Sequence, residues 1–189
     1  MAVRKILLYP DQKAALRKKC EPVQSFDRSL RRLIADLTDT LLARPEGIGL
    51  AAPQVNDHRR VAVVRLGSGC QEGGEAGPPM PLINPAILEA GDERKDFDGC
   101  LSSPGLHGER IRPHYLHVAG LDGDGRPLDR VFEGFDAVVV HHEIDHLDGV
   151  LFIDRVERSE DLYRVGVDED GNRLRVPASA AVSVGPGRT

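Results

Sequence analysis

The strongest hydrophobic pattern in the first part of the chain is helical and covers residues 25–47. Its apolar residues recur at helical spacing, which places them on one helix face: Leu30, Leu33, Ile34, Leu37 and Leu41. Either Ser25 or Asp27 can cap the first turn, and Pro45 and Gly47 end the pattern. The sequence therefore predicts an N-terminal amphipathic helix that packs on the core.

Shorter segments with β-branched or alternating apolar residues predict strands. There are four such segments, at residues 59–66, 82–90, 114–122 and 126–134. The sequence DGDGR, at 122–126, is typical of a hairpin turn between the last two strands. The glycines and prolines of residues 67–81 follow no period, so this stretch is predicted to be a mobile surface loop.

The segment GFDAVVVHHEIDHL, residues 134–147, predicts another helix, which ends at Gly149. Strands precede this helix without regular βαβ alternation. We therefore expect an α+β fold, with antiparallel or mixed β-sheets packed around this central helix. Residues 1–176 suit a single domain, and the small, Pro/Gly-rich residues 177–189 predict a disordered tail.

Composition limits the possible classes of function. The chain has 189 residues, a formal net charge of −5, 40% hydrophobic residues and 29% charged residues, an ordinary globular balance. It has no basic cluster typical of a nucleic-acid groove, no apolar run that approaches a membrane span, and no secretory h-region near its N-terminus. Three cysteines cannot pair completely, so we expect a cytoplasmic location and, for this small domain, a monomer.

The candidate chemistry is concentrated in HHEIDH, residues 141–146. His142 and His146 are four residues apart and project from one helix face, beside Glu143. In this H-E-x-x-H arrangement two histidines bind a metal and the glutamate acts on its bound water. His141 lies about a hundred degrees round the helix and points elsewhere. The alternative is a pair of solvated or core histidines, but the preceding AVVV indicates a buried helix, whose polar groups need partners.

Two histidines do not complete a catalytic metal site, which usually has three protein ligands and a water molecule. The residues leave two completions open. One is Glu157 or Glu160 downstream, as in a zinc endopeptidase; the other is Cys100, as a thiolate in the turn-like FDGCLSSPG. A third segment, GIGLAAPQV at residues 47–55, combines small residues with the amide of Gln54. Alone, it is most typical of a tight packing turn.

The three segments together are far more specific than each one alone. GIGLAAPQ, GCLS and HEIDHLDG, in this order and at these separations, resemble the peptide deformylase family, and the flanking LINP, EGFDA and GVLFIDR agree. The resemblance extends from about Val3 to Arg155. It implies a hydrolase that removes the N-formyl group from the N-terminal methionine of newly made polypeptides. Its partners would be the N-formylmethionyl peptides of nascent chains, met at the ribosome.

The resemblance also implies roles for the site residues. One divalent metal, physiologically Fe(II) and replaceable by zinc, nickel or cobalt, would be held by three side chains: Cys100, His142 and His146. The metal would lower the pKa of water, and Glu143 would take the proton and later deliver it to the departing amine. The side-chain amide of Gln54 and the backbone N–H of Leu101 would stabilise the charge that develops on the formyl oxygen.

Helix geometry indicates a pocket for the methionine side chain. Apolar residues on the face of the metal-binding histidines, with neighbours from the other two segments, could form this slot: Ile48, Leu101, Phe135, Val138 and Val139. Ordinary core packing is the alternative. Gly49 could offer its carbonyl group to the substrate backbone.

The sequence departs from the usual family pattern at several positions, and its C-terminal segment lacks a convincing long helix. Asp98 stands before GCLS in place of a glutamate, at a position that supports the metal ligands from behind. His141 replaces a glutamine, and the N-terminal PDQKAALR is longer than usual. These departures leave room for a related enzyme that acts on another formylated or acylated small substrate. A non-catalytic binding module is the remaining alternative, although the full set of catalytic residue types is present.

One ion pair is also expected. Asp145 lies between the two histidines on a helix expected to be buried, so its carboxylate needs a cation or several donors. By resemblance, Arg112 is a suitable partner. Such a pair would tie the GCLS segment to the histidine helix and hold Cys100 near the other ligands.

Overall fold

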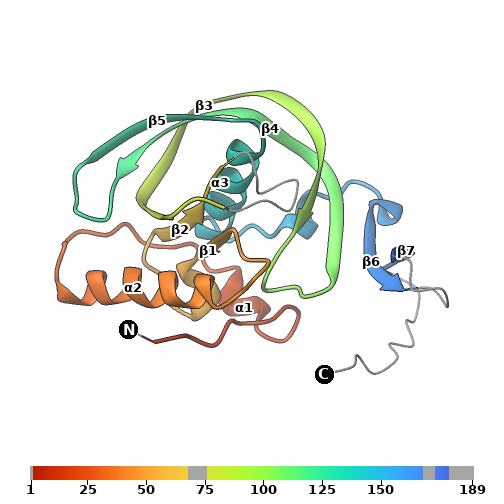
Figure 1. Ribbon diagram of the computed structural model, residues 1–189, viewed down its shortest axis with the longest axis horizontal. Coiled ribbons are helices and arrows are strands. Elements are labelled where there is room, and N and C mark those ends of the chain that lie inside the picture. Colours follow the sequence, from red (N-terminus) through yellow and green to blue (C-terminus); the bar gives the residue numbers. More distant parts are fainter. Residues whose placement is uncertain (1, 68–75, 168–172, 179–189) are drawn as a thin grey trace.

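The computed structural model describes residues 2–67, 76–167 and 173–178 (Figure 1). Helices and strands follow one another in these ranges as α1 Lys13–Leu16, α2 Arg28–Leu42, β1 Gly49–Ala51, β2 Val61–Arg65, β3 Pro79–Gly99, β4 Leu106–Leu121, β5 Pro127–Glu133, α3 Gly134–Leu147, β6 Leu162–Val167 and β7 Arg173–Pro177. Three short 3-10 helices lie between them: η1 Ala52–Val55, η2 Phe152–Arg155 and η3 Ser159–Asp161.

The strands form one sheet in the order β1-β2-β3-β4-β6-β7, and β5 pairs with β4 off this path. Each of the ladders between these strands is antiparallel. The fold is therefore α+β, with a mostly antiparallel sheet and few helices, as expected. Of the two sheet types that were expected, antiparallel or mixed, the ladders show the antiparallel one.

Strands β3 and β4 are much longer than the segments predicted for them. They contain 21 and 16 residues and pair from Ile83 opposite Leu121 to Gly99 opposite His107. Most residues of β3 between Ala86 and Phe97 are exposed, so this half carries no apolar alternation that would reveal a strand. Its hydrogen bonds to β4 hold it extended, and Figure 1 shows the pair curving over α3.

Helix α2 forms one hydrophobic layer with the first strands. The side chain of Asp27 caps its start by accepting a hydrogen bond from the backbone N–H of Leu30 at 2.9 Å. Its buried leucines pack against residues of β1, η1, β2 and β3 in a single cluster, among them Leu30, Leu33, Leu37, Leu41, Leu50, Val61, Val63 and Ile83. Leu50, Ala52 and Val55 of the segment GIGLAAPQV belong to this cluster, so packing against α2 holds the segment in place.

Helix α3 packs inside the curve of the sheet and contacts β1, β2, β4 and β5 (Figure 1). Its apolar residues Val139, Val140 and Ile144 belong to a second cluster, with side chains from β2, β3, β4 and β5. Because protein surrounds this helix on several sides, His142, Glu143, Asp145 and His146 are buried as well.

The C-terminal part of the described chain adds a hairpin that the sequence did not predict. β6 pairs with β4 over Leu106–Gly108, and β7 pairs with β6. β7 runs to Pro177, so strand structure reaches the first residue of the predicted tail. Residues 179–189 of that tail, and 68–75 of the predicted loop, lie outside the described residues. Among the helices of the described chain, none has the length and apolar character needed to cross a bilayer.

Candidate metal centre

Three predicted ligand side chains converge between β3 and α3. Cys100 directly follows Gly99, the last residue of β3, while His142 and His146 lie one turn apart on α3. One ligand atom from each residue lies within 4.8 Å of the other two, and Cys100 Sγ is 3.1 Å from His146 Nε2. A thiol and two imidazoles in this arrangement suit zinc, iron, cobalt or nickel.

The surroundings favour the thiolate form of Cys100. Burial alone raises the pKa of a thiol, but the charges and hydrogen bonds of His146 and His142 outweigh burial and lower the pKa of Cys100 to about 5. A cysteine ligand binds metal as the thiolate. The donor set therefore fits a divalent metal in its charge as well as in its geometry.

The Glu143 carboxylate lies beside the two histidines but outside the ligand group. It is 3% exposed, and its Oε2 has no hydrogen-bonding partner among the described residues. Burial outweighs the nearby histidine charges and raises the pKa of Glu143 to about 7. Gly49 makes room for this carboxylate, because a Cβ at Gly49 would lie 2.2 Å from Glu143 Oε1.

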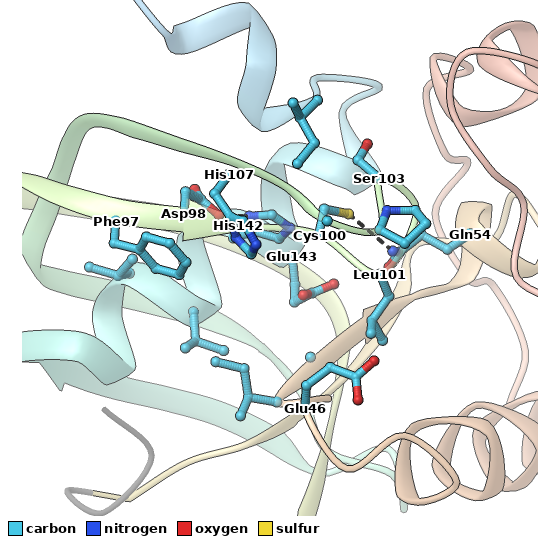
Figure 2. A pocket seen from close by; sticks show the side chains of 18 of the residues that line it. Glu46, Gln54, Phe97, Asp98, Cys100, Leu101, Ser103, His107, His142 and Glu143 are labelled. Atoms are coloured by element: carbon cyan, nitrogen blue, oxygen red, sulfur yellow. Dashed lines mark hydrogen bonds and ion pairs between the residues drawn. The ribbon is translucent and has the colours of Figure 1, made fainter. Parts of the chain in front are cut away.

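The amide of Gln54 is held in a fixed orientation at the same pocket. Its Oε1 accepts a hydrogen bond from the backbone N–H of Ala51 at 2.8 Å. Its Nε2 therefore faces Ser102 Oγ, at 3.1 Å. The same nitrogen lies 3.5 Å from Cys100 Sγ (Figure 2). The short helix η1 thus places an N–H donor next to the thiol. A turn that served only for packing would not require such a donor.

A cavity of about 300 Å³ opens beside these groups (Figure 2). Its lining includes the residues proposed for a methionine slot, together with Gly49: Ile48, Leu101, Phe135, Val138 and Val139. Sequence reasoning missed Phe97 and His107, which also line it and stack with their ring centroids 5.1 Å apart. They come from β3 and β4, and the register that brings these strands together is not evident from either segment alone.

Behind the ligands, a chain of ion pairs connects β3, β4 and α3. Asp98 Oδ1 lies 2.7 Å from His142 Nδ1, so the other imidazole nitrogen is free to face Cys100. Asp98 Oδ2 contacts Arg112 Nη2 at 3.0 Å, and Arg112 Nη1 contacts Asp145 Oδ2 at 2.5 Å. The structure thus contains the expected ion pair between Arg112 and Asp145.

The same network accounts for His141 and for a residue that sequence reasoning missed. His141 Nδ1 contacts Arg112 Nη1, so the ring lies on the arginine side of α3. Burial and the charge of Arg112 lower the pKa of His141 to about 4, so the ring is neutral at neutral pH. Arg155 of η2 completes the cluster, with its Nη2 2.7 Å from Asp145 Oδ1.

The residues proposed for an endopeptidase lie elsewhere. Glu157 and Glu160 are exposed and are not part of the ligand group, which takes Cys100 instead. A partly buried thiol and two buried imidazoles beside a carboxylate with an unpartnered oxygen, on an α+β fold, define the site of a metal-dependent hydrolase.

Comparison with known proteins identifies the family. The family model of polypeptide deformylases matches residues 3–162, and the chain belongs to this family. It is 41% identical over 170 residues to a peptide deformylase of Thermomicrobium roseum, covering 90% of this chain and 95% of that protein. It is also 39% identical over 158 residues to peptide deformylase 1 of Bacillus subtilis, covering 84% and 92% of the two chains.

Solved structures of peptide deformylases are also similar to this chain. A peptide deformylase of Ehrlichia chaffeensis in complex with actinonin aligns with a TM-score of 0.75 at 36% identity, over 84% of this chain and 91% of that one. A peptide deformylase of Thermotoga maritima aligns with a TM-score of 0.73 at 34% identity, over 84% and 100% of the two chains.

Proposed function

We propose that this chain hydrolyses the N-formyl group from the N-terminal methionine of newly made polypeptides. The observation that carries the proposal is the convergence of Cys100, His142, His146 and Glu143 at one cavity. Membership of the deformylase family supports the same reaction. Helix α3, with its H-E-x-x-H sequence, would be the central helix of the active site, and the amphipathic helix α2 would support the sheet beside it.

Cys100, His142 and His146 would hold one divalent metal, with Fe(II) as the physiological ion and zinc, nickel or cobalt as substitutes. The donor set supports a soft or borderline metal but does not select one of these. When bound, such a metal lowers the pKa of water and polarises a carbonyl oxygen.

Glu143 would accept the proton of the attacking water and return it to the departing amine. Its position next to His142 and its raised pKa of about 7 support this role, because a general base works best with a pKa near the operating pH. The amide Nε2 of Gln54 and the backbone N–H of Leu101 would donate hydrogen bonds to the formyl oxygen as negative charge develops on it.

Substrate binding would use the apolar side of the cavity. The methionine side chain would lie against the slot residues: Ile48, Leu101, Phe135, Val138 and Val139. Gly49 belongs to β1, which stands at an edge of the sheet, so no strand of the described residues lies along one side of it. Its carbonyl group could therefore accept a hydrogen bond from the substrate backbone.

We further infer that residues 1–176 act as one domain and that the protein works as a cytoplasmic monomer on chains emerging from the ribosome. The continuous family match over residues 3–162 supports a single unit. The incomplete set of cysteines supports a reducing compartment.

The test is an assay of protein purified without oxygen, with a formyl-methionyl tripeptide and the matching acetyl-methionyl tripeptide as substrates. We expect metal-dependent release of formate from the first and little hydrolysis of the second. Hydrolysis of the acetyl peptide at an equal rate would favour an enzyme for other acylated substrates. No turnover of either peptide by metal-loaded protein would contradict the proposal.

A further inference from the structure

Near the candidate metal ligands, strand β4 exposes an apolar side chain and buries two charged ones, the reverse of the usual distribution. Ile111 is 44% exposed, while its neighbours Arg110 and Arg112 have side chains with 0% exposure. Arginine is almost never fully buried unless it is paired. Two buried guanidinium groups on the same strand therefore indicate that their charges interact with buried groups of functional importance.

Both arginines contact the same carboxylate group. Asp98 lies on β3 opposite Gly108 of β4, and its Oδ2 forms ion pairs with Arg110 Nη2 and Arg112 Nη2. The other oxygen of Asp98 faces His142 Nδ1 at 2.7 Å. The carboxylate is thus held by two cations on one oxygen and by a proposed metal ligand on the other.

The two arginines differ in their remaining contacts. Arg112 also reaches Asp145 and His141, so it has a structural role independent of Asp98. For Arg110, Asp98 supplies the ion pair in the described part of the chain, and none of its three side-chain nitrogens makes a hydrogen bond of good geometry there. The Arg110 charge therefore depends on its ion pair with Asp98.

A buried charge with so few partners contributes little to the stability of a fold compared with a well-packed apolar side chain. Well-packed apolar side chains in place of buried ion pairs are often neutral or stabilising. If Arg110 only filled space, methionine would serve as well. A role in holding Asp98 explains the charge, because two cations on Oδ2 hold the carboxylate with its Oδ1 facing His142.

We propose that Arg110 is a positioning residue for the metal site, which acts through Asp98. With Arg112 it fixes the carboxylate so that Oδ1 accepts the Nδ1 proton of His142. The Nε2 atom of His142 is then held toward Cys100 and His146. This inference rests on the proposed function, since it assumes that these three residues bind metal.

The test uses Arg110→Met, which keeps bulk without charge, and Arg110→Lys, which keeps charge without the planar fork. Arg94→Met is the matched control, because Arg94 lies on β3, is 61% exposed and pairs with Asp92 away from the site. Each full-length protein is titrated with Co²⁺ against a chromophoric chelator, and its visible cobalt spectrum is recorded. Urea unfolding of the metal-free proteins measures stability.

For Arg110→Met we expect a cobalt affinity about 10- to 100-fold weaker than wild type, the range found for residues that orient metal ligands. Its cobalt bands should shift, and its metal-free stability should fall by less than that of Arg112→Ala, because Asp98 keeps Arg112 and His142 as partners. Arg110→Lys should fall between this variant and wild type, and Arg94→Met should bind cobalt like wild type. Should Arg110→Met fail to fold, weakened binding by a folded Arg110→Lys still supports the proposal.

Wild-type affinity and an unchanged cobalt spectrum in the folded Arg110 variants would overturn this inference and leave the metal site intact. Wild-type protein that binds less than one cobalt ion per chain would overturn the proposed metal site, and this inference with it. The two failures are therefore distinguishable in one titration series.

Discussion

Helices α2 and α3 are nearly equal in length, at 15 and 14 residues, but they bury different kinds of side chain. The buried side of α2 is mostly leucine, and its buried Asp36 is paired with Arg4 of the N-terminal segment. The buried residues of α3 include two histidines and two carboxylates. An amphipathic helix stabilises the fold through apolar contact alone. A helix that protein surrounds on several sides also buries polar groups, and the groups that gather around them form the site.

This contrast predicts that substitutions in the two helices affect different properties. Changes at α3 should alter chemistry or metal binding, with effects on stability only where an ion pair is broken. Changes at α2 should alter stability alone. Matched pairs of variants can test this separation.

The largest expected effect is that of Glu143→Gln on turnover. Loss of a general base typically lowers the rate by about 10²- to 10⁴-fold, and we expect a fall in kcat of this size. The metal content should remain at the wild-type level, since Glu143 is not in the ligand group. Stability should not fall, because the variant no longer buries a carboxylate with an unpartnered oxygen.

The measurements are steady-state deformylation, elemental analysis and urea unfolding. Glu89→Gln on the exposed part of β3 makes the same chemical change away from the site, and its turnover should match wild type. Wild-type turnover in Glu143→Gln would show that another group carries the proton.

The second largest expected effect is a loss of stability when the ion pair between Arg112 and Asp145 of α3 is broken. Among the described residues, Arg112→Ala leaves Arg155 as the remaining arginine partner of Asp145, and the side chain of Arg155 is 43% exposed. Removal of one partner from a buried ion pair typically costs about 3–5 kcal/mol, so we expect a loss of this order in the free energy of unfolding. Metal affinity should also weaken, because Asp98 loses one of its two cations.

Urea unfolding with and without cobalt measures both effects. Arg94→Ala removes an arginine of the same hairpin from an exposed ion pair, and its stability should change little. Equal unfolding midpoints for the two variants would contradict the role of Arg112 as a buried link.

The two helices also show how far the sequence alone could predict the structure. The spacing of leucines predicts α2, because one apolar face against a core leaves a regular pattern. The spacing of His142 and His146 predicts two of the three residues of the candidate metal site, since both lie on one helix. Cys100 follows the end of a strand that is distant in sequence from the helix. Local sequence pattern therefore could not decide whether Cys100 or a downstream glutamate is the third ligand, and only the family resemblance favoured Cys100.

Other features depend on strand register and could not be predicted from local patterns. Phe97 and His107 meet in the cavity wall because Gly99 pairs with His107 across β3 and β4. Arg110 and Arg112 face inward although their segment is highly charged, which sequence patterns assign to solvent. In both cases the position is set by backbone hydrogen bonds between strands, which leave no periodic signal in side-chain type.

A third prediction concerns the core side of α2. Leu37 is fully buried in the first hydrophobic cluster, and Leu37→Ala should cost about 2–5 kcal/mol of unfolding free energy. Metal affinity and kcat, measured well below the melting temperature, should remain at wild-type values. Leu42→Ala is the control on the same helix, because Leu42 is 52% exposed and its loss should leave stability nearly unchanged. A large fall in kcat for folded Leu37→Ala would contradict the separation between the two helices.

The smallest expected effect is a pH dependence at the start of α2. Asp27 accepts hydrogen bonds from the backbone N–H of Leu30 and from Ser29 Oγ, and these bonds lower the pKa of Asp27 below its usual 3.8. Helix α3 has no such side-chain cap at Glu133, the N-cap residue that precedes it. Because the folded-state pKa is depressed, the stabilisation by the charged cap is fully present above pH 3.8 and is lost as the pH falls through the lower, folded-state pKa. Asparagine also caps a helix but does not titrate in this range. Urea unfolding of metal-free protein should therefore show that wild type loses stability relative to Asp27→Asn as the pH falls below about 3.8. A stability difference that stays constant across this range would show that the Asp27 carboxylate has no preferential interaction with the helix.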